Sequence, residues 1–139
     1  MSLGGDFYAL TDNQLSRVLD GRLDYSKFLF DELPNEQPRE CLGDFEPLWL
    51  ALCNVLEEEK ACGIEQTDQI YLMCSYCFAN DVARIAPLLG VLTESVIQER
   101  CEQREVEGDP QEVWEAVQAL TQFYQRAAQN ADAVLLRVA

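Results

Sequence analysis

Residues 109–138 read DPQEVWEAVQALTQFYQRAAQNADAVLLRV and predict a long amphipathic helix followed by a strand. Asp109 is a typical helix cap, Pro110 is tolerated at the first helical position, and Glu112 suits the third. Apolar residues then recur at intervals of four and three, as they do along one face of an α-helix. They are Val113, Val117, Leu120, Tyr124 and Ala127. We therefore predict a helix over residues 109–130.

Two strands are predicted at the ends of the chain. Asn130 is a natural left-handed stop for the long helix, and the apolar run 133–138 that follows it predicts a terminal strand. Near the N-terminus, residues 6–10 (DFYAL) follow two glycines and also predict a strand. Because two isolated strands are not stable apart, we expect them to pair in one small sheet.

A short helix is predicted directly after the first strand. Thr11 supplies a hydroxyl cap, Gln14 stands at the third helical position, and Gly21 ends the helix. Its apolar stripe is Leu15, Val18 and Leu19.

The middle of the chain is predicted to be mainly helical. Residues 24–31 predict a second short helix, which the proline-bordered loop 33–38 ends. A further helix begins near Asp44, with Pro47 tolerated in its first turn. Its apolar face comprises Leu48, Trp49, Leu52, Val55 and Leu56. Residues 80–89 and 93–104 predict two more helices.

The apolar run 70–79 (IYLMCSYCFA) has no clear period, so it is either a buried helix or a buried strand. Its length and the neighbouring Ala and Met favour a helix. The chain as a whole predicts an α+β fold, a predominantly helical single domain over residues 1–139 with a small sheet that pairs the N- and C-terminal strands.

Charge and composition exclude several classes of function. Ten basic and 25 acidic residues give a net charge of −15, which disfavours nucleic acid and membrane surfaces as partners and favours a basic protein. The absence of histidine removes the commonest general base and transition-metal ligand. The N-terminus does not resemble a signal peptide. We expect a cytoplasmic, soluble protein with free thiols, without enzymatic activity, cofactor or metal.

Three segments resemble the YfbM-like family of bacterial proteins of unassigned function. They are residues 6–11 (DFYALT), the predicted helix around Trp49, and residues 123–128 (FYQRAA) running into 133–136 (AVLL). In that family we expect histidines just after the tryptophan and three residues later, where this chain has Leu50 and Cys53. The resemblance implies a largely structural likeness, and it implies that some relatives are immunity proteins that neutralise antibacterial toxins.

The six cysteines include one C-x-x-C motif, formed by Cys74 and Cys77. This spacing suits a redox dithiol or half of a zinc site, but a zinc site needs a second pair and a redox pair needs an electropositive setting. The remaining thiols stand singly in the sequence. We therefore interpret the motif as buried core thiols.

Acidic residues are concentrated in two segments. Residues 31–68 hold eleven acids and two bases, a net charge of −9. Residues 94–115 hold eight acids and two bases, a net charge of −6. Glu57, Glu58 and Glu59 are predicted to lie in the last turns of their helix, where the helix dipole disfavours negative charge. The leading hypothesis is a toxin immunity protein, a monomer when free, that blocks a basic cleft of its cognate toxin. Its predicted contact residues are Asp31, Glu32, Glu36, Glu40, Glu57, Glu58, Glu59, Glu65 and Asp68.

Two alternatives stay open at this point. The first is a small-molecule-binding or enzymatic domain, with a pocket between the sheet and the helices that carry Trp49 and Trp114. Its polar groups would be tyrosines, namely Tyr8, Tyr71, Tyr76 and Tyr124. The second is a homo-oligomeric scaffold, although a charge of −15 on each chain opposes self-association.

Overall fold

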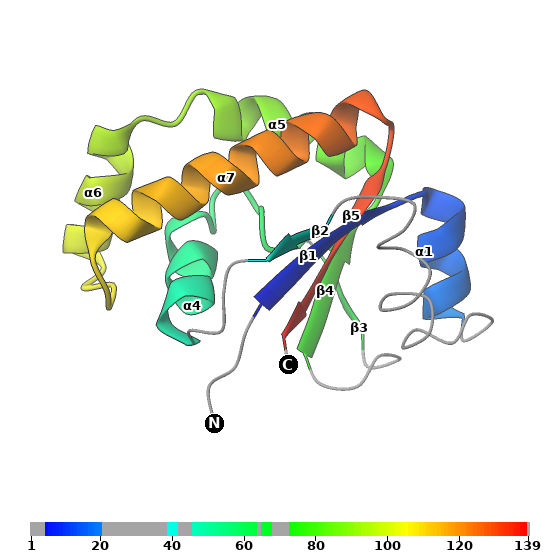
Figure 1. Ribbon diagram of the computed structural model, residues 1–139, viewed down its shortest axis with the longest axis horizontal. Coiled ribbons are helices and arrows are strands. Elements are labelled where there is room, and N and C mark those ends of the chain that lie inside the picture. Colours follow the sequence, from blue (N-terminus) through cyan, green and yellow to red (C-terminus); the bar gives the residue numbers. More distant parts are fainter. Residues whose placement is uncertain (1–4, 21–38, 42–45, 64, 68–72, 139) are drawn as a thin grey trace.

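The computed structural model describes residues 5–20, 39–41, 46–63, 65–67 and 73–138 (Figure 1). In chain order, the elements are β1 (Gly5–Leu10), α1 (Asp12–Leu19), β2 (Arg39–Cys41), α4 (Glu46–Val55), β3 (Glu65–Thr67), β4 (Met73–Cys77), α5 (Ala79–Gly90), α6 (Glu94–Gln103), α7 (Pro110–Gln129) and β5 (Ala133–Val138). The α+β class, with most of the described residues in helices and a small sheet that includes both terminal strands, is as predicted.

The C-terminal strand lies at the centre of the sheet. The strand order is β2-β1-β5-β4-β3, and every neighbouring pair is antiparallel. On one side β5 pairs with β1, with Leu10 opposite Ala133, and on the other side it pairs with β4, with Cys77 opposite Val134. The last strand of the chain therefore completes the hydrogen bonding of two earlier strands.

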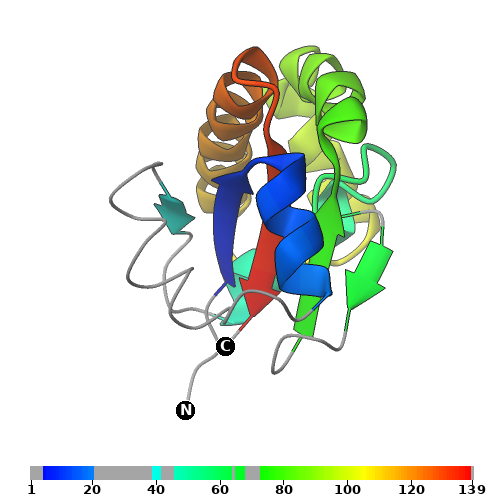
Figure 2. The same ribbon diagram turned by 90° about the vertical axis from the view of Figure 1, so that its right-hand side faces the viewer.

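Successive residues of β1 and β5 enter two different cores, as the period of a strand requires. Phe7, Ala9, Val134 and Leu136 belong to the larger core, which α4, α5, α6 and α7 cover. The alternate residues Tyr8, Leu10, Ala133 and Leu135 pack with α1 in a smaller core. Figure 1 shows α7 and α4 on one side of the strands and α1 on the other, and in Figure 2 α1 crosses in front of β5.

Both predicted helix caps are present. Thr11 and Gln14 form a reciprocal capping box at the start of α1, with bonds of 3.1 and 2.9 Å. Asp109 accepts a 2.9 Å hydrogen bond from the Gln111 amide at the start of α7. Every residue of the predicted α7 stripe is buried, as are Ala116 and Phe123. The rings of Phe123 and Phe7 pack edge to face at a centroid distance of 6.3 Å, which joins α7 to β1.

Three predictions need correction. The run 70–79 does not form the favoured helix, because residues 73–77 are the strand β4 between β5 and β3. Cys77 lies in the larger core and Tyr76 packs against the smaller one, so the two faces of β4 both carry apolar residues and show no amphipathic period. Asn130 has a φ of −90°, and the left-handed residue is Ala131, at 56°. The helix α4 ends at Val55, so the three glutamates at 57–59 follow the helix instead of ending it.

The predicted helix 24–31 and loop 33–38 lie outside the described residues. Among the residues that are described, no helix is both long and apolar enough to cross a bilayer.

Because β5 is central in the sheet, we predict that truncating one of its buried side chains lowers the free energy of unfolding. Leu135 is fully buried, so Leu135→Ala should lower the free energy of unfolding by about 2–5 kcal/mol, out of a total of about 5–15 kcal/mol. The matched control is Leu88→Ala on α5, where the side chain is 44% exposed and the effect should stay within about 0.5 kcal/mol. Urea denaturation followed by circular dichroism measures both. Equal losses for the two variants would contradict the assignment of β5 to the core.

Candidate functional site

The principal ion pair of the described residues joins α6 to the turn that follows α4. One guanidinium nitrogen of Arg100, Nη1, lies 2.7 Å from Glu59 Oε1, and the other, Nη2, lies 3.2 Å from Glu59 Oε2. The two side chains are 17% and 10% exposed. A bidentate pair of this kind is stronger than an exposed single contact, because it is shielded from water and its geometry is fixed.

Arg104 makes a parallel contact one turn further along α6. Its Nη2 lies 2.7 Å from Glu58 Oε1, and Glu58 also lies 3.2 Å from Arg100. The two arginines donate to backbone carbonyls of α4 as well, Arg100 to Val55 at 2.7 Å and Arg104 to Asn54 at 2.6 Å. We call Arg100, Arg104, Glu58 and Glu59 the arginine clamp. Cations at the C-terminal carbonyls of α4 are favourable for its dipole.

The clamp also stabilises its own charges. The hydrogen bond from Arg104, helped by the positive charges of both arginines, lowers the pKa of Glu58 below its ordinary value. The hydrogen bond with Glu59 raises the pKa of Arg100. Glu59 was predicted as a contact residue for a partner, but its carboxylate is buried against a guanidinium.

The arginine clamp separates the charges of residues 94–115. Both cations of this segment point toward α4, whereas all eight of its acids are exposed. We call these acids the acidic face; they are Glu94, Glu99, Glu102, Glu105, Glu107, Asp109, Glu112 and Glu115. The acidic face runs over α6, the loop to α7 and the first turns of α7.

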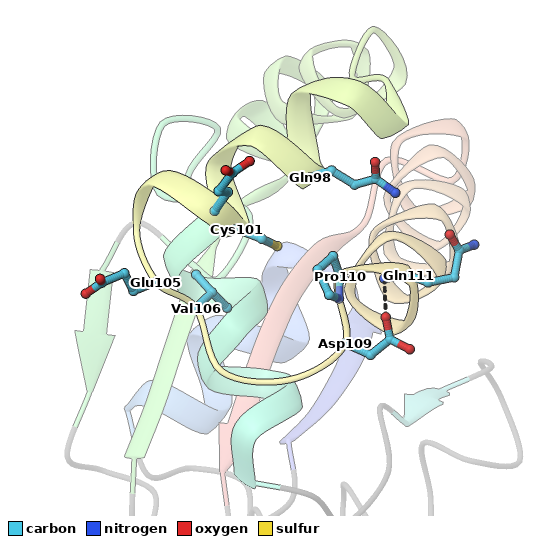
Figure 3. Close-up of a pocket in the computed structure, with 8 residues that line it drawn as sticks. Gln98, Cys101, Glu105, Val106, Asp109, Pro110 and Gln111 are labelled. Carbon is cyan, nitrogen blue, oxygen red and sulfur yellow. Dashed lines mark hydrogen bonds between the residues drawn. The ribbon is translucent and has the colours of Figure 1, made fainter.

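A groove with a cavity volume of about 590 Å³ lies within the acidic face, between α6 and the start of α7 (Figure 3). Carboxylates of the acidic face are among its lining residues, which are Gln98, Cys101, Glu102, Glu105, Val106, Asp109, Pro110 and Gln111. In Figure 3 the side chains of Cys101 and Val106 point toward Pro110 across the groove. Burial raises the pKa of the Cys101 thiol, so this thiol stays neutral, and Cys101, Val106 and Pro110 supply the apolar part of the lining. Such a groove suits a side chain with an apolar stem and a cationic head.

Those of the predicted contact acids that the structure describes are not gathered on one surface. Glu40 is on β2, where it pairs with Phe7 of β1, and Glu65 is on β3, where it pairs with Tyr76 of β4. The backbones of the two glutamates therefore lie at opposite edges of the sheet. Glu57 is exposed, whereas Glu58 and Glu59 belong to the arginine clamp. The remaining predicted contacts, Asp31, Glu32, Glu36 and Asp68, lie outside the described residues.

The tyrosines predicted for a pocket are mainly packing residues. Tyr8 and Tyr124 are fully buried, and the Tyr124 hydroxyl donates a 2.6 Å hydrogen bond to the Ala61 carbonyl. Tyr76 packs edge-on against Phe78 at a centroid distance of 5.7 Å. Tyr71 lies outside the described residues.

The described cysteines occupy two kinds of environment. Cys77 of the C-x-x-C motif is a buried free thiol, as expected, and burial raises its pKa to about 11. Its sulfur lies 3.8 Å from the Tyr124 hydroxyl. Cys53 and Cys62, which stand singly in the sequence, are free thiols of intermediate exposure.

Comparison with known proteins gives a consistent picture of the fold. A family model described as a domain of unknown function, DUF1877, matches residues 1–137. The crystal structure of YfbM, a protein of unknown function from Escherichia coli, is similar, with a TM-score of 0.66 and 12% sequence identity, and the match covers 98% of this chain and 99% of YfbM. A comparison with curated protein sequences found no significant match. The family resemblance predicted from the sequence is confirmed.

The geometry of the arginine clamp predicts that substitutions of Glu57 and Glu59 lower the free energy of unfolding by different amounts. Glu59→Gln removes the negative charge beside Arg100 and should lower the free energy of unfolding by about 1.5–3 kcal/mol, the range for a hydrogen bond to a charged group. Glu57→Gln is the matched control, with an effect within about 0.5 kcal/mol, because Glu57 is exposed. Chemical denaturation at neutral pH measures both. A Glu59→Gln variant as stable as Glu57→Gln would show that the clamp contributes little.

Proposed function

The chain belongs to the DUF1877 family, and from this premise we propose that it is a binding protein, an immunity protein that blocks a cognate toxin through its acidic face. The proposal concerns protein recognition and involves no catalytic step. The observation that carries it is the separation of charge by the arginine clamp.

The separation of the arginines from the acids matters because the electrostatic steering of a partner depends on the field at the surface where it docks. If Arg100 and Arg104 pointed outward, two of the eight charges on the acidic face would be neutralised by neighbours on the same helix. Both guanidiniums instead neutralise Glu58 and Glu59, which belong to another segment. A surface with one sign of charge raises the rate of encounter with an oppositely charged partner and fixes the orientation of docking.

The position of the acids on α6 favours binding over stability. Glu102 lies in the last turn of α6, where the helix dipole disfavours a negative charge. A lysine at this exposed position would be favourable for the helix. Retaining an acid here is what we expect of a surface adapted to a basic partner.

The acidic face is also held in place before binding. The arginine clamp ties α6 to α4, and α7 packs on the sheet through Phe123 and Tyr124. The groove between α6 and α7 could then accept an arginine or lysine of the partner, with its stem along Val106 and Pro110. A preformed surface loses less entropy on binding than a disordered one.

The partner that fits this surface is a protein with a basic cleft. Toxins that act on nucleotides or nucleic acids need basic clefts for their phosphate-bearing substrates, and an acidic surface can occupy such a cleft in place of the phosphates. Relative to the hypothesis from the sequence, the proposed contact moves from residues 31–68 to residues 94–115, where all eight acids are exposed and Glu102, Glu105 and Asp109 line one groove.

The test uses the product of the adjacent reading frame, co-expressed and purified with this chain. Glu102→Lys should slow association at low ionic strength about threefold or more, and the double variant Glu102→Lys/Glu107→Lys about tenfold, because each reversal weakens the steering field. Glu57→Lys is the matched control, an exposed acid outside the acidic face, and should change the rate less than twofold. Surface plasmon resonance at two salt concentrations measures the rates.

Protection of cells from the toxin should fall in the same order as the association rates. Three results would contradict the proposal. They are a neighbouring gene product that does not bind, association that is independent of salt, and a larger effect from Glu57→Lys than from Glu102→Lys.

A further inference from the structure

The outer surfaces of α5 and of the second half of α7 carry no acidic residues. Residues 82–93 and 116–131 contain two arginines and neither Asp nor Glu, so all 25 acids of the chain lie outside these two segments. The two helices pack side by side over the larger core, on the side of the sheet away from α1 (Figure 1, Figure 2). We call the exposed residues of the two segments the acid-free face.

The acids that border the acid-free face in the sequence are paired, buried or part of the acidic face. Asp81 lies 2.8 Å from Arg84 and pairs with it, and Asp132 is only 3% exposed. Glu94 and Glu115 belong to the acidic face. A chain with a net charge of −15 therefore presents a neutral to weakly basic surface here.

A row of four glutamines forms the outer surface of this part of α7. The residues recur at intervals of four, three and four, and all are exposed; they are Gln118, Gln122, Gln125 and Gln129. This spacing is that of one helix face, and the buried residues of α7 occupy the opposite face. Because a carboxamide both donates and accepts hydrogen bonds, a row of glutamines is complementary to a second copy of itself.

A groove of about 330 Å³ lies between the two helices. Its lining consists of small side chains and the end of the glutamine row, namely Ala83, Ala86, Pro87, Gln125, Ala128 and Gln129. Pro87 has no N–H, so the carbonyl of Ala83, one turn earlier in α5, cannot receive the usual helical hydrogen bond from residue 87. A side-chain amide of another molecule can donate to this carbonyl at the groove.

A large apolar side chain is also exposed on the acid-free face. Val91, directly after α5, is 76% exposed. Covering it with a second molecule removes apolar surface from water, which is favourable. The acid-free face therefore combines apolar groups with hydrogen-bonding groups that carry no charge.

We propose that the acid-free face binds a second copy of this chain, in a two-fold symmetric dimer in which the glutamine rows of the two copies face each other. In such an interface both copies contribute the same residues, so the surface must be complementary to itself. Carboxamides and apolar side chains meet this condition, whereas acids of the same charge repel each other.

The distribution of charge favours a second copy over a partner of another kind. A net charge of −15 opposes self-association, and for this reason the sequence predicted a monomer. The repulsion between two copies is smallest when each presents its acid-free face to the other. A basic protein is instead attracted to the acidic face, where the field is strongest.

A dimer of this kind leaves the acidic face free. Glu112 and Gln129 are 17 residues apart on α7, which is roughly 25 Å along the helix axis. Dimerisation therefore does not depend on the proposed immunity function, and either proposal can fail without the other.

The test is sedimentation equilibrium of the full-length chain alone, under reducing conditions so that no disulfide joins two copies. Over roughly 5–500 μM, a range that covers weak protein interfaces, the average mass should rise from that of one chain toward that of two. Raising the salt concentration from about 0.05 to 0.5 M should strengthen the dimer about threefold or more, because salt screens the repulsion between the two chains. Binding of a basic partner through the acidic face should respond to salt in the opposite direction.

Charge variants of the glutamine row test the location of the interface. Gln125→Glu should weaken the dimer about threefold or more, and Gln125→Glu/Gln129→Glu about tenfold or more, because the substitutions place like charges on both sides of the interface. Asn13→Asp is the matched control, an exposed amide on α1 that also becomes a carboxylate, and should change the dissociation constant by less than about 1.5-fold.

A mixing experiment tests whether the same face of both copies takes part. The Gln125→Glu/Gln129→Glu chain and a Gln125→Lys/Gln129→Lys chain should each dimerise poorly alone and form a heterodimer when mixed, because opposite charges then meet. Circular dichroism confirms that each chain is folded.

Three results would overturn the proposal. The first is the mass of a single chain at every protein and salt concentration. The second is a dimer that Gln125→Glu weakens no more than Asn13→Asp does, because that dimer would use another surface. The third is a mixture of the two charged variants that does not associate more strongly than either variant alone.

Discussion

The ion pair between Arg100 and Glu59 is the interaction on which the other features of this molecule depend. Both side chains are largely buried, so removing either one would leave a charge poorly solvated. The pair orients Arg100 toward α4, supports the parallel contact of Arg104, and neutralises the charge that follows α4. The acidity of the opposite side of α6 and the position of the turn after α4 follow from this arrangement.

The sheet provides the frame within which this pair forms. Because β5 is central, the long helix α7 that precedes it is held across the sheet, and the N-terminus of α7 comes to lie beside α6. Asp109 and Glu112 at that N-terminus are favourable for the helix dipole, and Asp109 is also the cap. In the first turn of α7, negative charge therefore serves both stability and the acidic face, whereas the helix dipole opposes Glu102 in the last turn of α6.

Local sequence patterns predicted the features that depend on neighbours in the chain. The capping box at Thr11, the cap at Asp109 and the apolar stripe of α7 involve spacings of two to four residues, and all are present. The strand β4 was missed because a strand covered on both faces has no distinctive period, and only its pairing with β5 distinguishes it from a helix. The arginine clamp could not be predicted, because it joins residues more than 40 positions apart.

The most direct test of this account is a double-mutant cycle on Arg100 and Glu59. The free energy of unfolding is measured for the wild type, Arg100→Gln, Glu59→Gln and the double variant, all at neutral pH and under reducing conditions. The account predicts that the double variant is less destabilised than the sum of the single variants, with a coupling energy of about 1.5 kcal/mol or more. Additive losses, with a coupling below about 0.5 kcal/mol, would contradict the central role of this pair.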